Sequence, residues 1–277
     1  MDSQQLLRAQ AFKALHERDG AFIIPNPWDA GSAKLLAALG FEALATTSAG
    51  LAFTLGRVDA EGAISRAETL NNITAIVAAT GLPVAADLEN CFADSPEGCA
   101  ETILQAAATG IVGGSIEDAS GHADDPIYDF ELSVERVKAA VAAARSLPFP
   151  FMLTARAENL LHGRDDFPDT LRRLEAYAQA GADVLYAPGV RTREQVIAVV
   201  RAVAPKPVNV LMGFAGVTLS LADLSELGVK RISVGSSLAR AAWGGLHRAA
   251  EEMRTHGTFT YGEQALPFDR LNTLFKG

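Results

Sequence analysis

The feature that most constrains the fold is a unit that recurs along the chain: a helical stretch that ends at a glycine, followed by a short β-rich run. Examples are "LLAALGFEALATTSAG", "QAAATGIVGGSIED" and "YAQAGADVLYAPG". Glycine is favoured after the last helical turn because it adopts the left-handed conformation there. The run that follows is too short for a helix and too apolar for a loop. The glycines predicted at this position are Gly40, Gly81, Gly110, Gly181 and Gly228.

Eight such β-rich runs alternate with helical stretches, which predicts a (β/α)8 TIM-type barrel in a single domain over residues 1–277. The alternative, an open doubly wound sheet, requires a glycine-rich turn after its first strand, and "PNPWDAGS" lacks that pattern. The predicted strands span about residues 21–26, 43–48, 84–89, 113–118, 151–157, 184–188, 207–212 and 231–235. The predicted helices between them are 30–39, 64–80, 96–109, 132–145, 169–180, 193–202 and 221–227.

The charge balance excludes several partner classes. Lysine and arginine number 24 against 33 acidic residues, so the formal net charge is −9. Nucleic acid and anionic membrane surfaces require basic patches, so we expect neither as a partner. No apolar run reaches the roughly 18 residues needed to span a membrane, and the amino terminus lacks the apolar core of a signal peptide. Two cysteines are too few for a disulfide framework, so we expect a cytoplasmic protein. Because nucleic acid and membrane surfaces are not expected as partners, we expect the partner to be a small molecule.

Carboxylates gather where the predicted strands end. Asp87 and Glu89 close the third run, and Glu117 closes the fourth. Side chains alternate along a strand, so Asp87 and Glu89 are expected to face the same side, where their charges require a proton or a cation. Oxygen ligands without a nearby histidine or thiol favour Mg²⁺, with Mn²⁺ as an alternative. The alternative is structural, because carboxylates at strand ends commonly serve as the N-caps of the helices that follow.

Arg156, in "TARAEN", follows the fifth run and admits two interpretations. It is either a structural counterion to Glu117 or Glu158, or a bidentate clamp on a substrate carboxylate, which suits the planar guanidinium.

Several motifs in order along nearly the whole chain make it resemble the isocitrate lyase and phosphoenolpyruvate mutase superfamily. They are "NPWDAGSAKLLAALGFEALATTSAGLAFTLGRVDAE", "AADLENCF", "GGSIEDAS", "TARAENLL", "VNVLMG" and "VGSSLARAA". The resemblance implies that Asp59 and Arg156 are catalytic and that Mg²⁺ is held largely through water. It assigns the metal to Asp87, Glu89 and Glu117, and the substrate to Ser48, Ala49, Gly50, Arg156 and Asn209.

One departure from that superfamily narrows the chemistry. Its isocitrate-cleaving members carry a lid motif, K-[KR]-C-G-H, whose cysteine delivers a proton, whereas this chain reads "EDASGHADDPIYDFE" over the expected lid at 119–130. Cys91 is interpreted as a small packing residue rather than a substitute. Loss of CO₂ needs no general acid at bond cleavage, so a decarboxylase is least affected by the missing cysteine.

The predicted function is therefore a Mg²⁺-dependent carbon–carbon lyase acting on a small 2-oxo di-acid, with oxaloacetate decarboxylation as the leading case. Alternatives are 2-methylisocitrate-type cleavage, with His122, Asp124 or Tyr128 supplying a proton, and phosphoenolpyruvate mutase or phosphonopyruvate-type chemistry. A non-catalytic 2-oxo acid binder is the further alternative. A Schiff-base aldolase is excluded because none of the six lysines is placed at a strand's carboxyl end.

The C-terminal region 237–277 is predicted to be helical and amphipathic. Trp243 and Leu246 lie on its apolar side and either pack on the barrel or reach another subunit. The resemblance implies an exchanged C-terminal helix and a homo-oligomer, a tetramer or a dimer.

Overall fold

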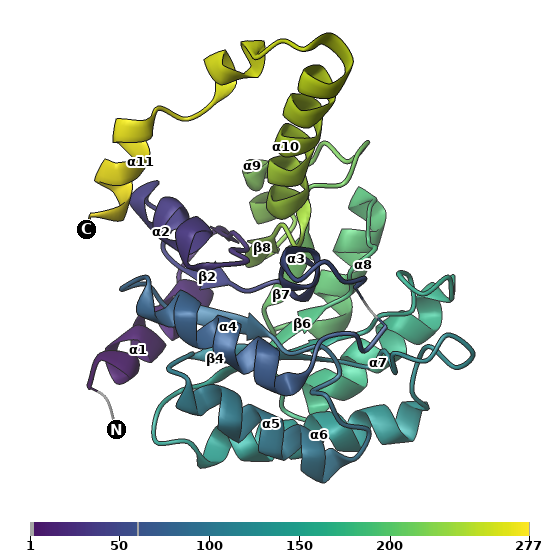
Figure 1. Cartoon of the computed structure of the whole chain (residues 1–277). Helices are drawn as coiled ribbons and strands as arrows, with labels where there is room; N and C mark the ends of the chain where they lie inside the picture. The colour runs from purple at the N-terminus through teal and green to yellow at the C-terminus, as the bar shows by residue number, and fades with distance from the viewer. Residues whose placement is uncertain (1–2, 60, 277) are drawn as a thin grey trace.

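The computed structural model describes residues 3–59 and 61–276 and contains a nearly closed barrel of eight parallel strands (Figure 1). This confirms the predicted (β/α)8 fold. Most strands are shorter than predicted but begin within two residues of the predicted starts. They are β1 (Phe22–Ile24), β2 (Leu44–Ala45), β3 (Val84–Asp87), β4 (Gly113–Glu117), β5 (Met152–Arg156), β6 (Val184–Tyr186), β7 (Val208–Leu211) and β8 (Arg231–Ser233).

Each strand pairs in parallel with its neighbour in the order β1-β8-β7-β6-β5-β4-β3-β2. Between β1 and β2 the contact is a hydrogen bond from the amide of Ala45 to the carbonyl of Pro25, at 3.1 Å, rather than a ladder. All strand carboxyl ends therefore point to one mouth, where barrel enzymes place their chemistry.

Helices surround this barrel. Seven of those between strands begin within two residues of the predicted starts, whereas the short helix after β2 was not predicted. The helices between strands are α2 (Ala30–Ala38), α3 (Ser48–Thr54), α4 (Arg66–Ala78), α5 (Pro96–Ala108), α6 (Phe130–Ser146), α7 (Phe167–Gln179), α8 (Arg193–Val203) and α9 (Leu221–Glu226). No helix among the described residues is long and apolar enough to cross a membrane.

An additional helix, α1 (Ser3–Glu17), covers the amino end of the barrel. Its Phe12 is fully buried, and a Cβ built on Gly113, the first residue of β4, would lie 2.9 Å from the Phe12 ring. His16 packs edge-on against Phe12 and against Phe22, the first residue of β1. The lumen is thus closed at the end opposite the mouth.

The predicted glycine caps are confirmed at four of five positions. Gly40, Gly110, Gly181 and Gly228 have φ between +86° and +104°. The prediction for Gly81 is wrong, because α4 ends at Ala78 and the chain has already left the helix when it reaches this glycine.

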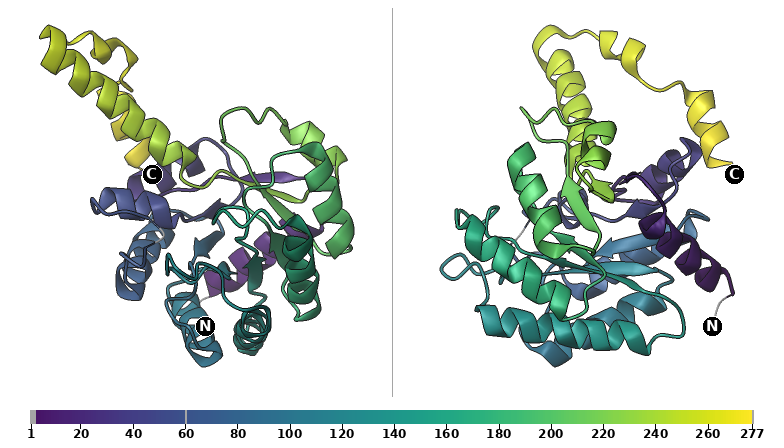
Figure 2. Two further views of the ribbon diagram at one scale, coloured as in Figure 1. Left: turned by 90° about the vertical axis from the view of Figure 1, so that its right-hand side faces the viewer. Right: turned by 180° about the vertical axis from the view of Figure 1, so that it is seen from behind.

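After β8 the chain forms an arm that leaves the barrel. It consists of α10 (Ser237–His256), the 3-10 helix η1 (Thr260–Gln264) and α11 (Phe268–Phe275), which returns to lie beside α2 (Figures 1 and 2). Ala239 is the one buried residue of the described arm, whereas Trp243 is 43% exposed and Leu246 is 56% exposed.

Candidate active site

A cavity of about 240 Å³ opens within the barrel at the strand carboxyl ends; we call it the lumen cavity. Residues from all eight strands and from the loops after them line it, and many of them are polar where barrel interiors usually carry bulky apolar side chains. Its polar lining includes Ser48, Asp59, Asp87, Ser115, Thr154, Arg156, Tyr186, Asn209, Arg231 and Ser233.

Arg156, at the end of β5, lies among three carboxylates. Its Nη1 donates to Asp87 at 2.9 Å, its Nη2 lies 3.0 Å from Glu117, and its Nε donates to Glu158 at 2.7 Å. Tyr186 lies beneath the guanidinium, with its ring centroid 5.2 Å away. The counterion interpretation of Arg156 is therefore seen in the structure, while its contact with substrate stays a prediction.

These carboxylates carry more negative charge than the one guanidinium neutralises. Burial, reinforced by Asp87 and Asp59, raises the pKa of Glu89 to about 8. Burial also raises the pKa of Glu158 to about 7 and the pKa of Glu117, against the opposing effect of Arg156. Such shifts mark a place where a proton or a cation is required.

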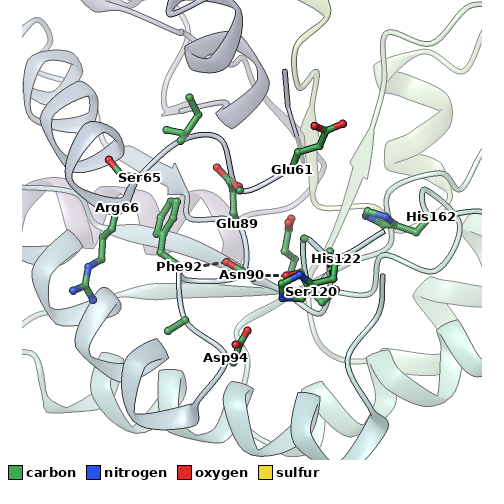
Figure 3. A pocket seen from close by; sticks show the side chains of 16 residues that line it. Glu61, Ser65, Arg66, Glu89, Asn90, Phe92, Asp94, Ser120, His122 and His162 are labelled. Carbon is green, nitrogen blue, oxygen red and sulfur yellow. Dashed lines mark hydrogen bonds between the residues drawn. The ribbon is translucent and has the colours of Figure 1, made fainter. Parts of the chain in front are cut away.

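A second cavity of about 580 Å³ lies outside the strand ends; we call it the outer cavity (Figure 3). Glu89 and Glu117 line it, together with Glu61, His122 and His162. The carboxylate cluster thus stands between the two cavities, with Asp87 in the lining of the lumen cavity and Glu89 in that of the outer one.

This separation corrects the prediction that Asp87 and Glu89 face the same side. Strand β3 ends at Asp87, so the strand alternation no longer applies two residues later. Glu89 has φ of +48°, and Cys91 and Phe92 are also left-handed, at +60° and +54°. Three non-glycine residues in this region store strain, which is characteristic of functional loops.

Arg136 of α6 holds that strained loop and was not found from the sequence. It is 1% exposed, and its guanidinium donates to the backbone carbonyls of Asn90 at 2.7 Å, of Asp94 at 2.8 Å and of Ala93. The guanidinium carbon also lies 4.0 Å from the ring centroid of Tyr128. The sequence did contain a signal for it: Arg136 is a charged residue at helical spacing from Ser133 and Ala140, which lie on the buried face of the helix.

Ser48 and Gly50 use their polar groups within the protein. The Ser48 amide and hydroxyl donate to Asp87 at 3.2 and 3.0 Å, and the Gly50 amide donates to the Thr47 hydroxyl at 3.3 Å. The prediction of strand through residue 48 is wrong, since Thr47 caps α3. Ala49 lines the lumen cavity. Substrate binding by Ser48, Ala49 and Gly50 stays a prediction.

Asn209 and Asp59 both line the lumen cavity, as expected for site residues. The Asn209 amide donates to Ser233 at 2.9 Å, and its oxygen accepts from Arg231 at 2.9 Å. Arg231 was missed from the sequence, although "RIS" places Arg231 and Ser233 on one face of the last strand.

The donor chemistry of Asp87, Glu89 and Glu117 fits a hard divalent ion, because all three are oxygen ligands in a site with excess negative charge. In the described part of the chain, however, no three carboxylate, histidine or thiol groups converge on one point. That Mg²⁺ is held largely through water stays what the resemblance implies. The metal assignment itself stays a prediction.

The expected lid, 119–130, folds back on itself through a bridge between Ala119 and Ile127. His122 lines the outer cavity, but Tyr128 is buried, and burial with a hydrogen bond to Asp94 raises its pKa to about 12. Tyr128 is therefore a poor proton donor. Cys91 is fully buried, in agreement with its interpretation as a packing residue.

The chain is similar to known proteins over nearly its whole length. The family model described as phosphoenolpyruvate phosphomutase matches residues 12–254. A solved protein from Burkholderia cenocepacia J2315, described only at the level of lyase/mutase, is 60% identical, with a TM-score of 0.96 over 100% of this chain and 98% of that chain.

Two further relatives are more distant. An uncharacterized protein of Mycobacterium tuberculosis is 31% identical over 262 residues, which is 94% of each chain. The structure of oxaloacetate acetylhydrolase in complex with its product oxalate is 25% identical, with a TM-score of 0.86, and covers 96% of this chain and 93% of that chain.

Proposed function

Because the chain belongs to the phosphoenolpyruvate phosphomutase family, within the isocitrate lyase superfamily, we propose that it is a Mg²⁺-dependent carbon–carbon lyase acting on a small 2-oxo di-acid. Family membership supports lyase or mutase chemistry. Decarboxylation of oxaloacetate is the leading specific case. Dependence on a divalent metal is general in the superfamily.

The observation that carries the proposal is the excess of carboxylates around Arg156 at the barrel mouth. Asp87, Glu117 and Glu158 share one guanidinium, and Glu89 beside them has a pKa of about 8 because of burial and its acidic neighbours. A purely structural cluster would need no further cation, whereas this one gains stability from one.

When bound, a divalent ion supplies Lewis-acid stabilisation of the charge that develops on a 2-oxo group as the adjacent carbon–carbon bond breaks. The residues with a role around it are Asp87, Glu89 and Glu117, which would hold the ion through water. Arg156 keeps Asp87 and Glu117 in place, and Ser48 fixes the orientation of the Asp87 carboxylate with two hydrogen bonds. In the leading case the broken bond releases CO₂, and water then returns a proton to the third carbon.

The test is the loss of oxaloacetate with purified protein, measured against the spontaneous Mg²⁺-promoted rate. We expect turnover that EDTA abolishes and that Asp87→Asn lowers by at least about 100-fold, since that change removes one of the few charges that hold the metal. Asp19→Asn, an exposed aspartate at the amino end of the barrel, is the matched control and keeps full activity.

The products decide the reaction within this class. Pyruvate and CO₂ indicate decarboxylation, whereas oxalate and acetate indicate hydrolysis of the kind named for the oxaloacetate acetylhydrolase relative. No turnover above the Mg²⁺ background would reject oxaloacetate as the substrate.

We also infer a homo-oligomer, a dimer or tetramer, built on α10. Trp243, Leu246 and Met253 expose apolar surface along a helix that projects from the barrel (Figure 2). Light scattering after size exclusion is expected to give a multiple of 29.1 kDa for the wild type and a smaller species for Leu246→Glu. A wild-type monomer would contradict the inference.

A further inference from the structure

The lumen cavity contains a second buried arginine that the carboxylate cluster does not use. Arg231, the first residue of β8, is 6% exposed and lines this cavity. Its Nε donates to the Asn209 oxygen and its Nη2 donates to the Thr154 hydroxyl, both at 2.9 Å. Both partners are neutral.

Within residues 3–59 and 61–276, no carboxylate lies within ion-pair distance of Arg231. Burial lowers its pKa to about 10, which shows how little the surroundings stabilise the charge. Tyr186 supplies no counterion, because burial raises the pKa of its phenol and keeps it protonated. A buried cation without a counterion is costly unless an anion completes it.

We propose that Arg231 forms an anion-binding subsite in the lumen cavity and binds one carboxylate of a substrate that carries two. This subsite rests on the proposed function, because that function defines which end of the substrate lies at the carboxylate cluster. Thr154 contributes its hydroxyl, which accepts from Arg231 through its oxygen and can donate its hydrogen to a bound carboxylate.

The charge distribution of the cavity supports a di-acid. Asp87 and its acidic neighbours require a cation, whereas Arg231 requires an anion, and both arginine and aspartate line the same space of about 240 Å³. That volume is below the range of about 300–1,000 Å³ typical of larger ligands and suits a molecule of few carbons. The two unmet charges would fix which end of the substrate faces the carboxylate cluster.

Arg231 would act in binding rather than in bond breaking if the substrate is oxaloacetate. The distal carboxylate then leaves as neutral CO₂, and attraction to a guanidinium stabilises it only before the bond breaks. An interaction made in the ground state alone lowers KM without raising kcat.

The experiment compares calorimetric affinities for succinate and butyrate, two unreactive four-carbon ligands that differ by one carboxylate, at saturating Mg²⁺. We expect the wild type to prefer succinate by about tenfold or more. Arg231→Met should bring the ratio close to one, and Arg231→Lys should restore part of it.

Asn209→Asp is the complementary variant, because it places a carboxylate against Arg231 without changing the size of the side chain. We expect it to remove the preference for succinate while melting no lower than the wild type. A structural role alone would lower the melting temperature of Arg231→Met and leave the ligand ratio unchanged, which would overturn the proposal. If Arg231→Met does not fold, an unchanged ratio in Asn209→Asp would overturn it equally.

No turnover is needed for this measurement. A protein that is inactive on oxaloacetate but still distinguishes succinate from butyrate would reject the proposed decarboxylation and leave the anion subsite standing.

Discussion

Arg156 and Arg231 line the same cavity but lie in opposite electrostatic surroundings. Arg156 contacts Asp87, Glu117 and Glu158, whereas Arg231 contacts an amide and a hydroxyl. Burial is similar for both, so the difference lies in what surrounds each charge. Around Arg156 the carboxylates outnumber the guanidinium, whereas around Arg231 the guanidinium has only neutral partners. This arrangement is expected of a site that orients a charged ligand.

The largest effect is expected from Arg156→Met, which leaves three buried carboxylates without their cation. We expect the free energy of unfolding at neutral pH to fall by about 3–5 kcal/mol and turnover to disappear. Urea denaturation measures the first and the oxaloacetate assay the second. Lys138→Met, which breaks an exposed ion pair with Glu135, is the control and should cost at most about 1 kcal/mol. An equal loss of unfolding free energy in the two variants would show that the carboxylates around Arg156 depend on it no more than an exposed ion pair depends on its cation.

A smaller loss is expected from Arg136→Met, which removes the donors to the loop between β3 and α5. Three backbone carbonyls lose their charged partner, so the free energy of unfolding should fall by about 2–4 kcal/mol. Because the loop positions Glu89, we also expect a weaker apparent affinity for Mg²⁺, measured by activation of turnover. Unchanged Mg²⁺ activation would show that the loop keeps its geometry without Arg136.

The amino end of the barrel offers a pH test near Arg231. Burial and the charge of Arg231 lower the pKa of His16 to about 3 from its usual 6.5. Between these values the unfolded chain binds a proton at His16 that the folded chain does not, so stability falls as the pH drops. This contributes about 1.4 kcal/mol per pH unit.

His16→Leu should remove that component, so its urea midpoint should fall less steeply than that of the wild type between pH 6.5 and the onset of acid unfolding. The exposed His247 gives the control substitution, His247→Leu, which should leave the slope unchanged. Parallel curves for wild type and His16→Leu would show that His16 is protonated in the folded protein.

The smallest change in stability is expected from Arg231→Met, although it is chemically the same substitution as Arg156→Met. Removing an uncompensated buried charge offsets the loss of its two hydrogen bonds, so the free energy of unfolding should stay within about 1 kcal/mol of the wild type. Urea denaturation in parallel with Arg156→Met measures it. A loss as large as that of Arg156→Met would indicate a counterion that balances Arg231 in solution.

The sequence by itself determined the barrel, because its information is local. Helix caps at glycines such as Gly40 and Gly181, and apolar runs too short for helices, are properties of a few adjacent residues. Where local signals were weaker the predictions were wrong, as at Gly81 and at residue 48, where Thr47 begins a helix instead of continuing a strand. The polar residues at the strand ends were also visible in sequence, since strand ends in a parallel barrel meet at one mouth.

Only the tertiary structure decided which of these side chains contact one another. Arg156 meets Asp87 from a position 69 residues away, and Arg231 meets Thr154 from a position 77 residues away. Such pairings depend on barrel register, and on where β3 ends and Glu89 turns to the outer cavity. Net electrostatic balance is likewise a sum over residues distant in sequence. That Arg231 has neutral partners and no carboxylate beside it among the described residues is therefore seen only in the closed barrel.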